Sequence, residues 1–404
     1  MAPRSEAPSL RRRALAHGVY WFLAMTPLGL MLPYFALYLR EEAGLSGAEI
    51  GAVMAVMPAV AMFCQPFWGI VADRTGLRAR TLVVLCAGAA AGYLAIGAAE
   101  GLRALLAATA LLAVFARALI PLSLSVSIPA FADHAHAFGL VRALGTIGFG
   151  VAMFGFPALL ASAASASGRA PAGLGLLFPA AAVLSGAAAL AALALPAGGA
   201  LALRAAPGEW RSLARNGPFV RLLALGVGAF LFQNGPLELF PVLVRARGGD
   251  YETIRTMWVW MLVPEVVLIA LLGAALARFA PRSLLAIGLL ANGVRWLGTA
   301  GLESLAWLAP LQALHAVVVL GLMLGGPLYL DAAVPAQLRS TAQAGFAVVS
   351  VGVGGTASSL LSGWLLDVGG PAAPCGVAGA GSLLLALAAR RWLPRVRGGW
   401  REAG

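Results

Sequence analysis

The chain has 404 residues, of which 61% are hydrophobic and only 11% charged, and its formal net charge is +12 at pH 7. An ordinary soluble domain carries about a quarter charged residues, so this composition excludes one. Runs of roughly 20 apolar residues recur along the whole length, and each predicts a membrane-spanning helix. Apolar and polar residues do not alternate as a membrane β-barrel requires. We therefore expect an all-α integral membrane protein, and no nucleic-acid binding because no soluble basic face remains.

Twelve transmembrane helices are predicted in chain order. They fall at about 14–39, 48–72, 81–99, 104–130, 138–162, 172–195, 217–244, 255–277, 283–302, 305–331, 341–366 and 372–392. The tail before the first span carries Arg4 and Arg11 to Arg13. A cleaved twin-arginine signal is the alternative interpretation of this segment. Because no small-residue cleavage site follows the apolar run, we predict an uncleaved first span.

The connector between the second and third spans is short and carries four charges. Its sequence from Gly69 to Arg80 is Gly-Ile-Val-Ala-Asp-Arg-Thr-Gly-Leu-Arg-Ala-Arg. A weaker copy follows 204 residues later, where Gly273, Ala277, Arg278, Ala280 and Arg282 occupy the positions of Gly69, Asp73, Arg74, Gly76 and Arg78. One charged hairpin therefore occurs in each half of the chain.

Arginines are distributed unequally between the two sides of the predicted bundle. All 28 basic residues are arginine. With a cytoplasmic N-terminus, nineteen of them fall on the cytoplasmic side, six on the opposite side and three within spans. Positive charge accumulates on the cytoplasmic side of membrane proteins, which places both termini in the cytoplasm.

The chain reads as two six-helix halves, 1–195 and 217–404, joined by a basic connector at 196–216. Several prolines and glycines recur at a common offset of 206 residues: Pro58 with Pro264, Pro121 with Pro327, Pro129 with Pro335, Gly139 with Gly345 and Gly148 with Gly354. A common offset across loops and spans indicates duplication. Repeats of this kind build transporters with a substrate cavity between the halves.

Ionisable residues inside the spans are the candidates for function, because a charge at the bilayer centre costs about 2.5–3.5 kcal/mol. These are Arg117, Glu238, Glu265, Arg295 and His315. Structural pairing is the alternative for each one taken alone. Three of them lie on consecutive helices of the second half, which favours a cavity-lining role for the set.

Polar neighbours extend this candidate site. Asn292 shares a helix face with Arg295, and Gln312 shares one with His315, since each pair is spaced i, i+3. Gln233 and Asn234 place amides near the middle of the seventh span. Tyr34 is a further substrate-binding candidate in the first span, with aromatic packing as the alternative.

Glu265 and His315 are both candidates for carrying a proton. A carboxyl group that alternates between apolar surroundings and a nearby arginine can bind and release a proton. Histidine changes its charge between about pH 5 and 8 with little perturbation. The residues themselves do not decide between the two.

The hairpin resembles the loop between the second and third helices of major facilitator superfamily transporters, and its first copy matches the G-x-x-x-D-R-x-G-x-R pattern at every fixed position. The resemblance implies a conformational latch formed by Gly69, Asp73, Arg74, Gly76 and Arg78. In that role Asp73 meets the positive end of a neighbouring helix, Arg74 or Arg78 meets carboxylates, and the contacts favour the outward-facing state.

Further segments resemble the phenylpropionate permease group, which is related to lactose permease and the nucleoside symporters. They are 140–150, Pro264-Glu265, Val294-Arg295-Trp296, 312–315 and 334–343. The resemblance implies proton-coupled import, with Glu265, Arg295 and His315 at positions where lactose permease uses a carboxylate, an arginine and a histidine. Lactose permease has another glutamate three residues after its histidine, and here Val318 stands instead. This difference favours Glu265 as the proton site.

The sequence as a whole predicts a twelve-helix, proton-coupled importer of the inner membrane, a monomer that exchanges a small solute and protons across the lipid bilayer. Efflux by antiport and a non-transporting membrane sensor are the alternatives. No nucleotide-binding loop, metal-ligand cluster or nucleophile motif is present in the sequence. We therefore expect no enzyme activity, no cofactor and no metal.

Overall fold

A computed structural model describes residues 9–167, 173–196, 209–276 and 279–396, without the side chains of 135, 163–167, 209–210, 269–276 and 323. Every regular element in this part of the chain is a helix. Contact clustering divides the chain into two compact units. The first comprises residues 1–43 and 60–203, and the second comprises 44–59 and 204–404.

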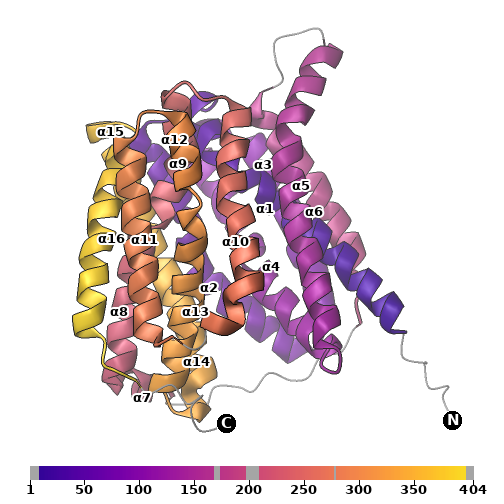
Figure 1. Ribbon diagram of the computed structural model, residues 1–404. Helices are drawn as coiled ribbons and strands as arrows, with labels where there is room; N and C mark the ends of the chain where they lie inside the picture. The colour runs from indigo at the N-terminus through magenta and orange to yellow at the C-terminus, as the bar shows by residue number, and fades with distance from the viewer. Residues whose placement is uncertain (1–8, 168–172, 197–208, 277–278, 397–404) are drawn as a thin grey trace, which may run out of the picture. The chain divides into compact units, whose positions relative to one another are not determined.

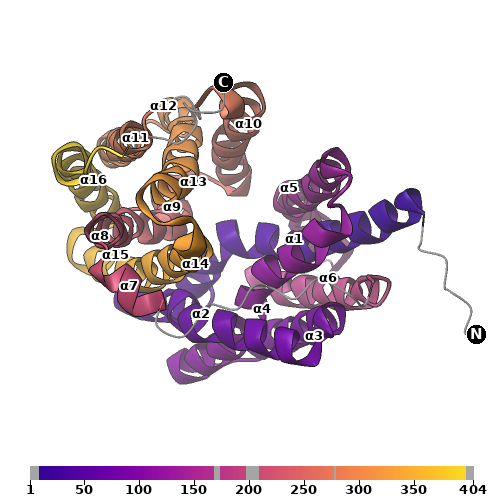
Figure 2. The ribbon, with the colours of Figure 1, turned by 90° about the horizontal axis from the view of Figure 1, so that it is seen from below.

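The first unit is built from long helices that run side by side (Figures 1 and 2). They are α1 (Leu10–Glu41), α3 (Arg78–Gly97), α4 (Gly101–Ala130), α5 (Ala135–Ser167) and α6 (Leu177–Ala192), with the last part of α2 (Gly47–Thr75). α1 packs on α5 and α6, and α3 packs on α4 and α6. Glycine permits this close packing: a Cβ atom at Gly92 of α3 would lie 2.6 Å from Leu112 Cα of α4, as small residues do at helix contacts in lipid.

The second unit has more and shorter helices. They are α7 (Glu209–Arg215), α8 (Gly217–Leu231), α9 (Asn234–Ala246), α10 (Tyr251–Leu276), α11 (Pro281–Gly301), α12 (Leu305–Leu311), α13 (Leu314–Ala333), α14 (Arg339–Val349), α15 (Gly355–Gly369) and α16 (Ala373–Trp392). A π-turn, Ser350–Gly354, joins α14 to α15. Figure 2 looks along the helix axes and shows α8, α11, α13 and α16 as neighbours.

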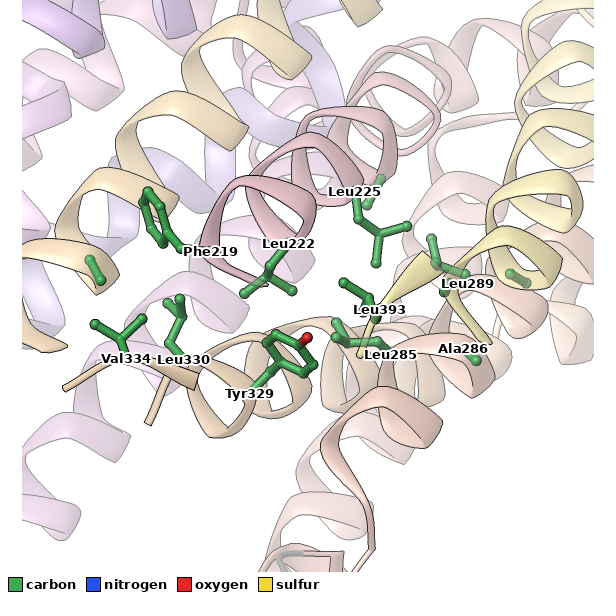
Figure 3. Packing of buried hydrophobic residues seen from close by; sticks show 14 of the residues in the cluster. Phe219, Leu222, Leu225, Leu285, Ala286, Leu289, Tyr329, Leu330, Val334 and Leu393 are labelled. Atoms are coloured by element: carbon green, nitrogen blue, oxygen red, sulfur yellow. The ribbon is translucent and has the colours of Figure 1, made fainter. Parts of the chain in front are cut away.

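The core of the second unit is an apolar cluster contributed by α8, α11, α13 and the end of α16 (Figure 3). Leu222, Leu285, Leu289 and Leu330 are buried members of this cluster. Tyr329 is fully buried in the same cluster, and its hydroxyl donates a hydrogen bond to Pro394 O at 3.3 Å. The phenol therefore satisfies its one polar group without leaving the apolar core.

The predicted spans are confirmed as helices. Among the described residues, eleven helical segments are long and apolar enough to cross a membrane, and each coincides with a predicted span. The remaining prediction, 255–277, coincides with α10, a helix of 26 residues. The all-α fold class is thereby confirmed. The central residues of the connector, 197–208, lie outside the described chain, as do Ala277 and Arg278 of the weaker hairpin.

The first turns of α2 belong to the second unit and are held by an acidic side chain of α15. Asp367 accepts hydrogen bonds from Gly47 N at 2.6 Å and Ala48 N at 2.7 Å. A Cβ atom at Gly363 would lie 2.7 Å from Gly51 Cα, so the two backbones touch directly. The carboxylate satisfies amides that a helix leaves unbonded at its N-terminus, where negative charge is stabilising.

Candidate functional site

The charged hairpin of the first unit is a tight turn closed by an ion pair. Arg78 Nη2 lies 2.7 Å from Asp73 Oδ1, and Arg78 Nε donates to the same oxygen at 3.2 Å. Gly76 has φ +68°, a left-handed conformation that side chains rarely adopt, which explains the glycine. Arg74 is exposed, and Gly69 is half-buried. Asp73 therefore finds its cation within the hairpin, and the latch role stays a prediction.

In the second unit, the seventh span is interrupted between α8 and α9, and the sequence shows why. Pro236 has no N–H, so the carbonyl of Phe232, four residues earlier, loses its helical donor. Asn292 Nδ2 of α11 donates to Phe232 O at 3.2 Å and to Ser382 Oγ at 2.9 Å. Asn292 is fully buried, so its amide satisfies a freed backbone group inside the bundle.

The tenth span is interrupted in the same manner between α12 and α13. Gln312 N donates to Ala309 O at 3.0 Å, which leaves Leu308 O without its usual donor. Gln312 Nε2 donates to that carbonyl at 3.3 Å and to Thr299 Oγ1 of α11 at 3.1 Å. The interruption therefore turns the Gln312 amide group toward α11.

Arg295 occupies the centre of this polar region. Its Nε donates to Gln312 Oε1 at 2.8 Å, its Nη1 contacts His315 Nδ1 at 3.2 Å, and its Cζ lies 4.1 Å from the ring centroid of Trp296. The side chain is fully buried. Among the described residues, no carboxylate oxygen lies within 4.0 Å of its nitrogens, although a buried guanidinium ordinarily has an acidic partner.

His315 lies between Arg295 and Glu265. Its Nε2 is 3.8 Å from Glu265 Oε2. This distance permits electrostatic attraction but is longer than a hydrogen bond. Because Arg295 can only donate, His315 Nδ1 must accept, and the neutral ring carries its proton on Nε2, facing Glu265. The three side chains therefore follow the order Glu265, His315, Arg295. Glu265 is the most accessible of the three, with 22% of its side chain exposed.

The other predicted residues of the second unit lie on α9 or, for Gln233, directly before it, and contact α15 and α11. Glu238 is buried and accepts a hydrogen bond from Ser359 Oγ at 2.7 Å. Asn234 is half-buried, and its Nδ2 lies beside Gly355. Gln233 Oε1 accepts from Trp296 Nε1 at 3.1 Å. This contact joins the start of α9 to the residue next to Arg295.

The two substrate-binding candidates of the first unit are Tyr34 and Arg117. Tyr34 is fully buried, its hydroxyl donates to Met153 O at 3.2 Å, and its ring packs 5.0 Å from that of Phe156. Arg117 is half-buried in α4, and its carbonyl accepts a hydrogen bond from Gln65 Nε2 at 3.0 Å. The packing role of Tyr34 is thus visible. Substrate contacts of Tyr34 and Arg117 stay predictions.

Sequence reasoning missed several polar partners. Thr299, Ser358 and Ser359 complete the network, with Ser358 Oγ accepting from Gly235 N at 2.7 Å. Thr299 stands four residues after Arg295, so helical spacing could have identified it. The serines of α15 carry no comparable signal, because serine is common on buried helix faces in membranes.

Comparisons with known proteins place this chain among membrane transporters. The profile of the MFS_1 like family matches residues 16–202 and 218–373. The maltose permease of Geobacillus stearothermophilus is 29% identical over 354 residues, 86% of either chain. The uncharacterized transporter YwbF of Bacillus subtilis (strain 168) is 33% identical over 145 residues, 36% of either chain.

Two solved structures share the fold. The nucleoside transporter NupG has a TM-score of 0.75 at 18% identity, covering 94% of this chain and 98% of that one. An auto-inhibited POT family peptide transporter has a TM-score of 0.73 at 14% identity, covering 97% and 99%.

Proposed function

Because this chain belongs to the MFS_1 like family of major facilitator transporters, we propose that it imports a small solute by proton symport, with alternating access to the two sides of the membrane. Glu265 and His315 carry the proton in this proposal, and Arg295 couples the proton to the solute. Gln312, Asn292, Asn234 and Glu238 line the route of the solute, with Arg117 and Tyr34 contributing from the first unit.

The observation that carries the proposal is the order of charges around His315. Arg295 Nη1 faces one ring nitrogen and Glu265 Oε2 the other. A proton added to Nδ1 would point at the guanidinium N–H groups, so protonation of His315 requires the Arg295 contact to open. The protonation state of this pair therefore decides which acceptors Arg295 can use.

The solute completes the cycle by offering Arg295 an acceptor. The buried guanidinium has five N–H groups, and the acceptors it meets are an amide oxygen, a ring nitrogen and, at 3.5 Å, Met261 Sδ. When Glu265 is protonated, an oxygen of the solute offers the N–H groups of Arg295 a stronger acceptor than the Met261 thioether does. Binding of the solute and of the proton then favour each other, which is the requirement for symport.

We propose a hydroxylated solute, an oligosaccharide or a nucleoside. A relative is named as a maltose permease and a fold neighbour as a nucleoside transporter. Amide, carboxyl and imidazole groups such as those of Gln312, Glu265 and His315 are suited to hydroxyl groups, which both donate and accept hydrogen bonds.

The same proposal includes the inner membrane as location, both termini in the cytoplasm, a monomer, and the two halves 1–195 and 217–404 as the moving bodies. The hairpin of Asp73 and Arg78 acts as a latch of the outward-facing state. Asp73→Asn tests this last role. It should raise cytoplasmic accessibility to thiol reagents and slow uptake at unchanged expression, and unchanged accessibility with full uptake would remove the latch.

Uptake into proteoliposomes tests the transport proposal. Maltose, longer maltosaccharides and nucleosides are offered with and without an inward proton gradient. Gradient-driven accumulation of one class supports symport, whereas gradient-driven efflux identifies an antiporter. If none of these solutes is transported in either direction, the protein is identified as a sensor.

Glu265→Gln then isolates the proton step. A neutral side chain cannot release a proton, so uphill accumulation should vanish while exchange at equal solute concentrations persists. Glu303→Gln, in the exposed loop between α11 and α12, is the matched control and should accumulate solute normally. If Glu265→Gln still accumulates solute, the proton-carrying role is assigned to His315.

A further inference from the structure

A second buried polar cluster lies in the first unit, where the N-terminal part of α1 packs on the end of α4. Three hydrogen bonds form a seam there: Tyr20 OH with Ser123 Oγ at 2.6 Å, Trp21 Nε1 to Ser127 Oγ at 3.0 Å, and His17 Nδ1 with Ser127 Oγ at 3.1 Å. Transport as proposed above uses none of these residues.

His17 is fully buried, and the seam fixes where its proton lies. The indole of Trp21 can only donate, so Ser127 Oγ accepts from it and has one hydrogen left to give. If Ser127 donates to His17 Nδ1, only the Nε2–H group of His17 remains unsatisfied. If His17 donates instead, the serine hydrogen and the free ring nitrogen are both left without partners. The ring therefore carries its hydrogen on Nε2.

That N–H has no acceptor among the described residues, and neither does the Nε–H of Arg13. Arg13 and His17 are spaced i, i+4, so they lie on the same face of α1 one turn apart. Both contact the same ring: Arg13 Cζ is 5.7 Å from the centroid of Phe131, and the His17 ring is 5.2 Å from it. A buried N–H without an acceptor is costly, and two adjacent ones indicate an acceptor that binds both.

The surroundings make that acceptor an anion. α1 begins at Leu10 with no acidic residue in its first turn, and Arg11 and Arg12 are exposed beside Arg13. Asp133, two residues beyond Phe131, is exposed and forms no ion pair within the described part of the chain. Positive charge and side-chain N–H groups without acceptors together attract an oxyanion.

We infer that Arg13 and His17 form a binding site for a phosphate oxyanion at the N-terminal end of α1, separate from the transport site. The guanidinium supplies the charge and one N–H, and the imidazole Nε2–H supplies the second donor without being protonated. The phosphate can come from a phospholipid headgroup, since juxtamembrane arginines attract anionic lipids, or from solution.

Titration with inorganic phosphate tests the site in the full-length protein, held in micelles of a phosphate-free, non-ionic detergent. Chloride keeps the ionic strength constant so that screening does not imitate binding. Glu6, outside the described residues, is replaced by glutamine in a parallel sample. We expect saturable phosphate binding by calorimetry and a raised midpoint of thermal unfolding.

Arg13→Gln and His17→Leu should each weaken phosphate binding by about tenfold or more, because each removes a donor to a charged acceptor. Arg12→Gln removes the same charge from an exposed neighbour and should change binding less than about twofold. His17→Gln keeps an N–H near the Nε2 position and should restore binding. The unfolding midpoint without phosphate identifies any variant that has lost its fold.

Equal losses in Arg12→Gln and Arg13→Gln would reduce the site to diffuse attraction and overturn the inference. So would phosphate binding that appears only with Glu6→Gln, since the acceptor would then be the chain's own carboxylate. Nanodiscs with phosphatidylglycerol separate the two sources. Loss of the phosphate response there assigns the site to a lipid headgroup, and an unchanged response assigns it to free phosphate.

Discussion

In the first unit, α1, α4 and α5 run through 32, 30 and 33 residues without a break. The spans in the same order in the second half, the seventh, tenth and eleventh, are interrupted at Phe232, at Gln312 and by the π-turn Ser350–Gly354. Proline alone does not account for the difference, since α1 contains Pro27 and Pro33 and stays helical. In the seventh span Asn292 of α11 satisfies the freed carbonyl, and in the tenth the side chain of Gln312 does so from within the span.

The two units also treat a buried arginine differently. Arg78 has its own carboxylate, Asp73, at 2.7 Å, and the pair neutralises itself. Arg295 is more deeply buried and is surrounded by neutral acceptors. The charge of Arg78 is balanced within the hairpin, whereas a buried cation without a carboxylate responds to any charge that approaches it.

The largest expected effect comes from Arg295→Lys. A single ammonium group cannot reach Gln312 Oε1 and His315 Nδ1 at once in the planar geometry of a guanidinium. We expect uptake to fall about 100-fold, roughly 2.7 kcal/mol, while the protein still folds. Arg247→Lys is the control, because Arg247 binds the carbonyls of Thr299 and Ala300 at the end of α11, and it should keep most of its uptake. Similar losses in both variants would contradict a special role for Arg295.

Asn292→Leu breaks the support of the interrupted seventh span. It leaves Phe232 O buried without a donor, which should cost about 2 kcal/mol of unfolding free energy. Thr26→Val is the control in continuous α1, where Thr26 Oγ1 only adds a bond to Phe22 O at 2.6 Å, and it should cost less than about 0.5 kcal/mol. Unfolding in mixed micelles measures both, and equal costs would mean that the interruption needs no side-chain donor.

Asp367→Asn tests how the first turns of α2 are held in the second unit. One of the two carboxylate oxygens becomes an NH₂ group, so the variant keeps one acceptor for Gly47 N or Ala48 N and loses the other. The expected cost is about 1 kcal/mol, as for loss of a helix cap. Asp331→Asn, whose Oδ1 accepts from Gln343 Nε2 at an exposed position, should cost less. A larger loss of unfolding free energy in Asp331→Asn than in Asp367→Asn would contradict the role of Asp367 in holding α2.

The smallest effects concern the glycines of the hairpin, and they should have opposite signs. Gly76→Ala places a side chain at φ +68° and should destabilise by about 1 kcal/mol. Gly69 lies within α2 with open space around its Cα, so Gly69→Ala should stabilise by about 0.5 kcal/mol. The same unfolding assay measures both variants. Destabilisation by both variants would contradict the open space at Gly69.

Much of the fold could be predicted because the hydropathy of a segment depends only on the residues of that segment. The positions of the spans follow from runs of apolar residues. The spacing of Gln312 and His315 predicted a shared helix face, and the structure adds that both side chains contact Arg295. The spacing did not indicate the partners of Asn292, which lies on α11 with Arg295 and donates hydrogen bonds to Phe232 O and Ser382 Oγ. Helical periodicity gives the face of a helix, and the element that covers this face is decided by tertiary packing.

The interruptions were the other part that sequence could not supply. Pro236 could have indicated the one at Phe232, but Pro27 and Pro33 show that the same residue is tolerated in a continuous helix. The outcome depends on Asn292, sixty residues away in sequence. The place of His315 between Glu265 and Arg295 depends likewise on how α10, α11 and α13 pack.

The π-turn Ser350–Gly354 has a consequence for the register of α15. A π-turn is equivalent to one residue inserted into an α-helix. Each residue of an α-helix turns the chain by about 100° and advances it by about 1.5 Å. Deleting one residue from the turn would therefore rotate everything that follows by roughly a quarter of a revolution, and Ser358 and Ser359 would leave Gly235 and Glu238. The hydrogen bonds that hold the beginning of α9 depend on a single inserted residue in another span.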